Sequence, residues 1–115
     1  MKAIIQNVKI MRIDQIWKKH KPQGLGFSDN DVIIIELKTA DGMKFKQDFY
    51  CRIKGDATLG HSITKRSEKR QIELKNFIKK YISEDEPYNI RANIDTWKGK
   101  EVNAEKIDGG FIIKI

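Results

Sequence analysis

The 115-residue sequence contains one cysteine, two prolines and two histidines, and it has no long apolar run. Because Cys51 is alone, no intramolecular disulfide can form, which excludes the disulfide-stapled scaffolds of small secreted proteins. The first residues lack the uninterrupted apolar segment of a secretory leader, and no stretch approaches the roughly 20 apolar residues of a membrane-spanning helix. These absences predict a cytoplasmic protein with no membrane partner.

The sequence is equally poor in residues of catalysis and cofactor binding. His20 and His61 both fall in predicted loops, and with one cysteine they leave few ligands for zinc. The chain also lacks a glycine-rich phosphate loop, a dinucleotide-binding fingerprint and the His-Glu-x-x-His pattern of metalloproteases. We therefore predict that the protein is not an enzyme, has no catalytic residues, and holds neither a metal nor a cofactor.

One short pattern argues for an enzyme instead. Glu36 and Lys38 have the Glu-x-Lys spacing of the PD-(D/E)xK nucleases, which this segment resembles at the end of a hydrophobic strand. Asp14 or Asp31 would then be the second acid that shares a divalent metal. That family also has a helix before the strand, and the residues before Glu36 show no helical pattern in this chain. A metal-dependent nuclease is therefore the third-ranked hypothesis.

The sequence is rich in charge and in regular apolar spacing. Hydrophobic residues make up 39% and charged residues 34% of the chain, as expected for one domain, residues 1–115, that folds around a core. The basic excess is concentrated: residues 1–30 carry six basic and two acidic side chains, and residues 43–70 carry eight and three. A localised positive field attracts polyanions, whereas a scattered one mainly gives solubility.

Strand patterns occupy the N-terminal half. Residues 4–13 have apolar side chains at both odd and even positions, which is typical of a long strand that curves between two faces. Residues 32–38 and 43–52 flank the turn Ala40-Asp41-Gly42 and predict a β-hairpin. In its second arm the odd positions are mostly apolar, while the even positions are charged or tyrosine. One face of this strand is therefore core and the other is basic.

The C-terminal half begins with one predicted amphipathic helix, residues 67–83. Ser67 can cap its first turn, and the apolar residues from Ile72 onward recur at spacings of three and four. Residues 88–95 then alternate between apolar and polar side chains, which predicts a half-buried strand. Two further turns each precede a short predicted strand, residues 101–107 and residues 111–115.

The order of these elements resembles that of the OB-fold, in which the helix lies between the third and fourth strands. The curved first strand and the segment Trp97-Lys98-Gly99-Lys100 after the helix add to the likeness, which covers nearly the whole chain. The resemblance implies a small antiparallel barrel, mainly β with one α-helix, that binds oligonucleotides or oligosaccharides across its second and third strands. The sixth predicted strand departs from the five-strand pattern, so another small-barrel fold remains an alternative.

Exposed rings beside cations are the pattern of single-strand binding, because bases stack on the rings while lysine and arginine neutralise phosphates. Tyr50 shares the basic face of its strand, and Trp97 falls on the polar side of the 88–95 strand. We predict largely non-sequence-specific binding of single-stranded DNA or RNA. The predicted contact residues are Lys18, Lys19, Lys21, Lys44, Lys46, Tyr50, Arg52, Lys54, Lys65, Arg66, Arg91, Trp97, Lys98 and Lys100.

Each of these residues also has a structural interpretation. A loop lysine is often only solvated, an outer tyrosine can cover the neighbouring strand, and a bulge would swing Trp97 into the core. The second hypothesis is a protein-interaction module, such as a small viral inhibitor or an assembly subunit, or a homo-oligomer. The charge distribution distinguishes nucleic-acid binding from protein binding, because basic residues gathered in two segments are not a general requirement of a protein-binding module.

Overall fold

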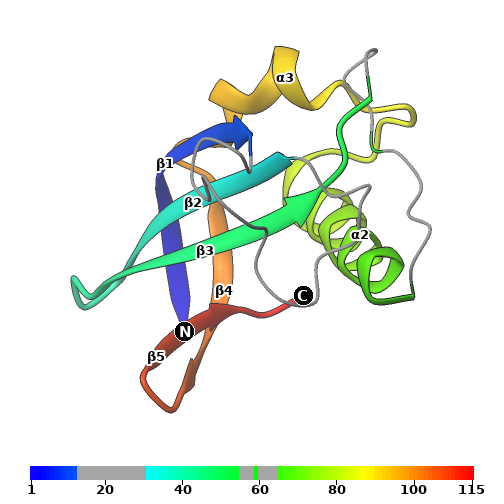
Figure 1. Cartoon of the computed structure of the whole chain (residues 1–115). Coiled ribbons are helices and arrows are strands. Elements are labelled where there is room, and N and C mark those ends of the chain that lie inside the picture. The colour runs from blue at the N-terminus through cyan, green and yellow to red at the C-terminus, as the bar shows by residue number, and fades with distance from the viewer. Residues whose placement is uncertain (13–30, 55–58, 60–64) are drawn as a thin grey trace.

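A computed structural model of the chain describes residues 1–12, 31–54, 59 and 65–115 (Figure 1). The described part is mainly β, and its first three strands precede the first helix, as predicted. In chain order the elements are β1 (Lys2–Arg12), β2 (Asp31–Thr39), β3 (Lys44–Cys51), α2 (Lys65–Phe77), a π-helical turn (Ile78–Ile82), α3 (Ile90–Asn93), a 3₁₀ turn (Ile94–Trp97), β4 (Glu101–Ile107) and β5 (Gly110–Ile113).

The strand β1 lies in the middle of an antiparallel sheet whose strand order is β3-β2-β1-β4-β5. It pairs with β2 from Ala3 onward but with β4 only near its start, where Lys2 lies opposite Asn103. A bulge between Ile5 and Asn7 shifts its register against β2. Because a bulge bends a strand and moves later side chains to the other parity, β1 serves two parts of the sheet. The predicted curvature of this strand is confirmed.

The hairpin between β2 and β3 is also confirmed. The backbone N–H of Thr39 donates to the carbonyl of Met43 at 2.8 Å, and Gly42 N–H donates to the Thr39 carbonyl at 3.0 Å. Gly42 has φ +88°, the left-handed conformation that closes a three-residue hairpin loop and that glycine adopts without strain. This turn fixes the register of the two strands, with Lys38 opposite Lys44.

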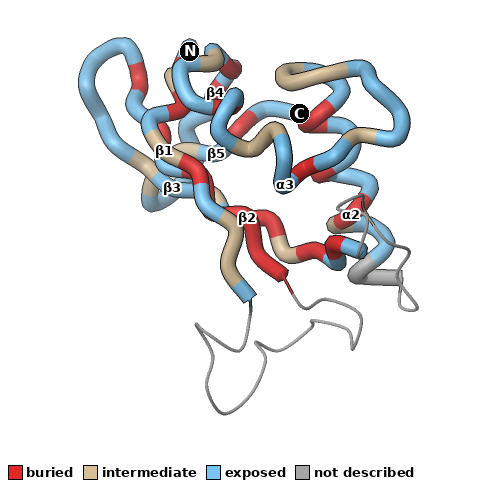
Figure 2. The backbone as a smooth tube through the Cα atoms, turned by 90° about the horizontal axis from the view of Figure 1, so that it is seen from above, coloured by how far each residue is buried: buried red, intermediate tan, exposed pale blue. Residues whose placement is uncertain are grey.

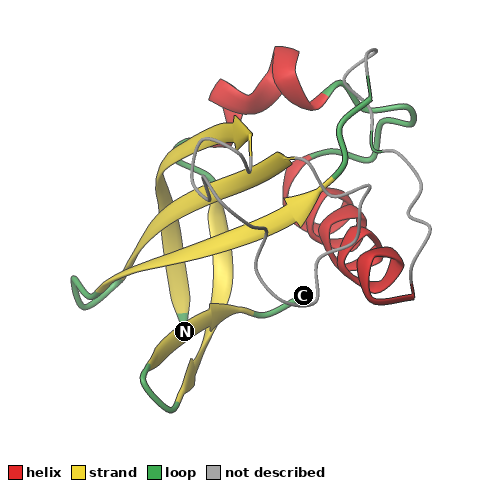
Figure 3. Cartoon of the chain, viewed as in Figure 1, coloured by secondary structure: helices red, strands yellow, loops and turns green. Residues whose placement is uncertain are grey.

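The core lies between the inner face of the sheet and the helix α2, which stands beside the end of β3 (Figure 3). Leu74 and Phe77 are fully buried, and the Phe77 ring stacks on Phe49 at 5.2 Å between centroids. Burying a side chain of this size contributes roughly 1.5–3 kcal/mol. Ile72 is 51% exposed, so its predicted place in the buried stripe is wrong. Gln71 lies on the buried side instead, because it is one turn before Leu74 on the same face.

The helix continues past Phe77 as one wider turn, Ile78–Ile82, which the N–H of Ser83 closes by donating to the Ile78 carbonyl at 2.9 Å. The hydroxyl of Tyr81 donates to the carbonyl of Lys114 and accepts from the N–H of Asn103. The end of the helix is therefore tied to the C-terminal strands. In the described ranges, no helix combines the length and the apolar character needed to cross a bilayer.

The predicted strand over residues 88–95 is wrong, because this segment forms α3 and the following 3₁₀ turn. The side chain of Asn89 accepts a hydrogen bond from Ala92 N–H at 2.9 Å, as an N-cap does. Ile90 and Trp97 are buried, whereas Ala92 is exposed. Asparagine is unfavourable in strands and favourable at helix starts, so the cap outweighs the alternation of apolar residues. The sheet therefore has five strands in the described part of the chain.

The two edges of the sheet, β3 and β5, curl towards each other (Figure 1). The Phe45 and Phe111 rings lie 5.6 Å apart, and Ile113 N–H donates to the side-chain oxygen of Gln47 at 2.7 Å. Both contacts join residues 66 positions apart, as they would if β5 ran parallel to β3. Within the described residues no backbone ladder joins these strands, so the sheet is not closed.

Candidate nucleic-acid interface

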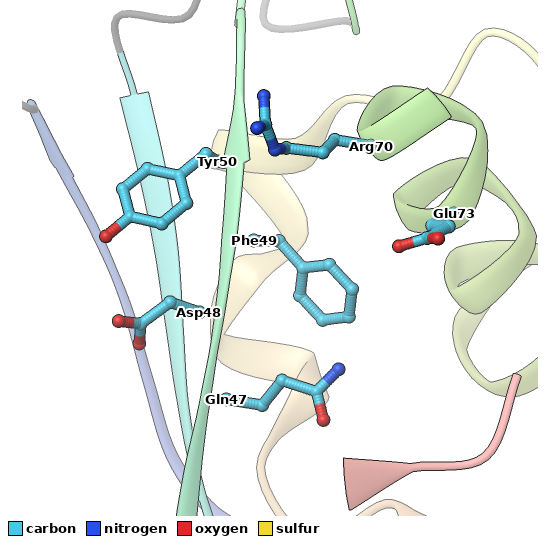
Figure 4. A pocket seen from close by; sticks show the side chains of 6 residues that line it. All are labelled: Gln47, Asp48, Phe49, Tyr50, Arg70 and Glu73. Carbon is cyan, nitrogen blue, oxygen red and sulfur yellow. The ribbon is translucent and has the colours of Figure 1, made fainter. Parts of the chain in front are cut away.

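The strand β3 presents a polar face on one side and a core face on the other, as predicted. Lys44, Lys46 and Asp48 are exposed and Tyr50 is partly buried, whereas Phe49 points towards the core. Figure 4 shows Asp48 and Tyr50 on one side of the strand and Gln47 and Phe49 on the other. The side of β2 and β3 that carries Lys38, Lys44, Lys46, Asp48 and Tyr50 is called the outer face below.

Neighbouring strands add charges to the outer face that are not among the predicted contact residues. Lys38 lies opposite Lys44, and Glu36 lies opposite Lys46. On β1, Lys9 lies opposite Ile34 and is exposed. Opposite residues in an antiparallel pair project to the same side. The hairpin symmetry about residues 40–42 already implied the Lys38 position, whereas the β1 partner depended on tertiary pairing.

The outer face changes character towards the start of β2. Val32 and Ile34 belong to it by register, opposite Tyr50 and Asp48, yet both are buried. The buried residues run without a break along this stretch of β2, as the red segment of Figure 2 shows. The outer face is therefore covered at Val32 and Ile34, and its exposed cations lie at the end beside the hairpin. Tyr50, opposite Val32, is partly exposed at the boundary between these two parts.

Several predicted contact residues lie outside the described part of the chain. These are Lys18, Lys19 and Lys21, and the side chains of Lys65 and Arg66, which begin α2. Arg52 and Lys54 are exposed just beyond β3. The backbone N–H of Arg52 donates to the Gln71 side chain at 3.4 Å, which holds this segment against α2.

Arg91 forms an ion pair rather than extending the outer face. Its guanidinium lies 3.4 Å from one carboxylate oxygen of Asp31, and the other oxygen accepts from Ile53 N–H at 3.1 Å. The Asp31 carboxylate is buried, so these two contacts provide the partners that a buried charge needs. The ion pair ties α3 to the start of β2.

The predicted exposure of Trp97 is wrong. Its side chain is fully buried, its indole N–H donates to the Tyr88 hydroxyl at 2.9 Å, and its ring meets Phe77 edge-on at 5.7 Å. A base cannot stack on a ring with no exposed surface. Lys98 and Lys100 follow in a turn whose backbone pairs with Ile5 of β1. That turn lies on the far edge of β1 from β2, at least two strand spacings or roughly 10 Å from the outer face.

A hollow of about 230 Å³ lies between α2 and the edge of β3 that faces away from β2 (Figure 4). Its lining residues are Gln47, Asp48, Phe49, Tyr50, Arg70 and Glu73. Arg70 and Glu73 were not predicted, because only folding brings α2 beside β3. The hydrogen-bonded pair of Thr39 and Met43 also sets the alternation along the hairpin, so the backbone groups of Asp48 and Tyr50 point towards this edge.

The arrangement separates the acids of the nuclease hypothesis. Asp31 turns inward to Ile53 and Arg91, whereas Glu36 lies on the outer face opposite Lys46. Asp14 falls outside the described residues. Among residues that the structure describes, no three His, Cys, Asp or Glu side chains gather as a metal site. Asp31 and Glu36 therefore do not form a shared divalent-metal site.

The chain was compared with known protein families, curated proteins and solved structures. No protein-family model, curated protein or solved structure matches the chain.

Proposed function

We propose that this protein binds single-stranded nucleic acid across the outer face, largely without sequence readout. The observation that carries the proposal is the gathering of Lys38, Lys44 and Lys46 with the Tyr50 ring on one face of two paired strands. Lysines neutralise phosphates and an accessible ring stacks bases, and together they are the physical requirements of single-strand binding. The predicted cytoplasmic location belongs to the same proposal.

The proposal includes an OB-like barrel. It is supported by the helix between β3 and β4, by the bulged central β1, and by the approach of β3 and β5 at the two sheet edges. OB-folds are partly open five-stranded barrels that bind oligonucleotides across strands two and three. In this chain those strands are β2 and β3, which carry the outer face.

Electrostatics favours a nucleic acid over an uncharged ligand. The outer face has three lysines, and Lys9 of β1 adds a fourth cation beside them, against the acids Glu36 and Asp48. Each phosphate that a lysine neutralises releases condensed counterions, which gives a salt-dependent affinity. The eight residues of β3 extend over about 27 Å, enough for several nucleotides.

The test is a salt titration of binding with labelled single-stranded and double-stranded oligonucleotides of equal length. We expect preferential binding of the single strand, with log affinity falling by roughly 2 per tenfold rise in salt, the value for three neutralised phosphates. Tighter binding of the duplex, or affinity that does not change with salt, would contradict the proposal.

A protein-interaction module is the alternative, and one observation favours it: within the described residues the edge of β3 away from β2 has no ladder partner, and the backbone groups of Asp48 and Tyr50 point from it towards the hollow. Such an edge can accept a strand from another chain. An absence of oligonucleotide binding at low salt, together with self-association measured by light scattering, would favour this alternative over the nucleic-acid proposal.

A further inference from the structure

Asp48 and Glu36 are the two carboxylates on the outer face, and Asp48 is the one beside Tyr50. Its neighbours on that face along β3 are Lys46 and Tyr50, and its side chain is exposed. Within the described residues it forms no hydrogen bond or ion pair. A negative charge here weakens the attraction for every phosphate nearby. Its position therefore needs another explanation than general affinity for nucleic acid.

The Tyr50 ring is the closest aromatic group to Asp48 on the outer face. Residues two apart on a strand project to the same side about 7 Å from each other, and Figure 4 shows both side chains on that side. Tyr50 lies opposite buried Val32, so the ring rests at the apolar end of the face. A base stacked on this ring would bring its polar edge within reach of the Asp48 carboxylate.

The chemistry of a carboxylate distinguishes bases by their edges. A carboxylate accepts hydrogen bonds and donates none. Cytosine, adenine and guanine carry amino groups that donate, whereas uracil and thymine present two carbonyl oxygens around one N–H. Carbonyl oxygens placed against a carboxylate leave both groups without a donor, which is costly once water is displaced.

We propose that Asp48 selects amino-bearing bases over uracil and thymine at the position that stacks on Tyr50. This inference rests on the proposed single-strand binding and adds one site of base preference to it. The hollow beside these residues supports the inference, because Arg70 and Glu73 border the same strand edge and the backbone groups of Asp48 and Tyr50 point towards it. A base edge at this strand edge would therefore face the backbone donors and acceptors of Asp48 and Tyr50 as well as the Asp48 carboxylate.

The experiment compares binding of oligo(dC) and oligo(dU) of equal length, measured by fluorescence anisotropy above neutral pH, where cytosine stays unprotonated. These pyrimidines differ at C4, where cytosine has an amino group and uracil a carbonyl, and at the neighbouring N3, which accepts in cytosine and donates in uracil. We expect the wild-type protein to bind oligo(dC) roughly fivefold to tenfold more tightly, the lower range for one polar base contact. Asp48→Asn should tighten both complexes, because a negative charge is lost, and should bring the ratio close to one, because an amide both donates and accepts.

Glu36→Gln is the matched control. It removes the same charge from the same face, opposite Lys46 rather than beside Tyr50, so both complexes should tighten while the ratio is retained. Equal wild-type affinities for oligo(dC) and oligo(dU), or an unchanged ratio in Asp48→Asn, would overturn the inference and leave single-strand binding intact. Failure of both oligonucleotides to bind at low salt would overturn the proposed function, and the inference with it.

Discussion

Two segments of this protein pair an aromatic ring with nearby cations, and the fold treats them in opposite ways. In β3, Tyr50 lies partly accessible on the same face as Lys44 and Lys46. In the 3₁₀ turn after α3, Trp97 is fully buried although Lys98 beside it is exposed. An alternating pattern shows which face a side chain occupies only if the segment is a strand. In β3 the hairpin turn makes the segment a strand, whereas the segment after α2 has no turn that pairs it with another strand.

The largest expected effect comes from Trp97. We expect Trp97→Ala to lower the free energy of unfolding by about 3–5 kcal/mol, because it empties a buried site and removes the hydrogen bond to Tyr88. Urea denaturation measures this change, and Trp97→Phe should lose less because a ring still fills most of the volume. If Trp97→Ala unfolded like the wild type but no longer bound oligonucleotides, Trp97 would be a contact residue and its structural role would be contradicted.

Tyr50→Ala should act on binding instead. We expect a loss of roughly 1–3 kcal/mol in oligonucleotide affinity, with an almost unchanged dependence on salt, because stacking releases few ions. Tyr50→Phe keeps the ring and should retain most of the affinity. A loss as large in Tyr50→Phe as in Tyr50→Ala would show that the hydroxyl, rather than stacking, matters at this position.

The lysines of the outer face should differ from Arg91, which is paired with Asp31. Lys44→Gln and Lys46→Gln should each reduce the slope of log affinity against log salt by about 0.7. Arg91→Gln removes the same charge and should leave the slope unchanged, while it weakens the contact between α3 and β2. An equal reduction in all three variants would show that overall charge, and not the outer face, determines binding.

The smallest expected effect concerns Glu86, which belongs to neither of the two aromatic segments. A hydrogen bond and the charge of Lys75, at 3.2 Å, together with Lys79 at 3.6 Å, hold the pKa of Glu86 below its usual value. A lowered pKa stabilises the fold above the unfolded-state pKa, and this contribution is lost as the pH falls through the folded-state pKa. Glu86→Gln should therefore lower the melting temperature slightly at neutral pH, and the difference should vanish on acidification. A difference that grows in acid would contradict this assignment.

The sequence predicted the elements whose signals are local. The hairpin followed from Ala40-Asp41-Gly42 between two strand patterns, and its turn determined which side chains of β3 face outward. The helix followed from Leu74, Phe77 and Ile78, whose spacing places them on one buried face. In these segments the information lies within a few residues, so the pattern and the structure agree.

The same reasoning could not locate α3 or the hollow beside β3. The alternation from Tyr88 to Ile94 suits a strand, but Ile90 and Ile94 are also one helical turn apart, and the Asn89 cap favours the helix. That Arg70 and Glu73 line one hollow with Asp48 depends on how α2 packs against the sheet. No local pattern records that packing.

The sequence by itself therefore determined a mainly β domain with one long amphipathic helix, and the polar face of β3 with its lysines and tyrosine. Tertiary structure decided the burial of Trp97, the ion pair of Arg91 with Asp31, and the placing of α2 beside the edge of β3 that faces away from β2. The physical reason is the range of the forces involved. Turn geometry and periodicity act between neighbours in the chain, whereas burial and ion pairing join residues that only the folded core brings together.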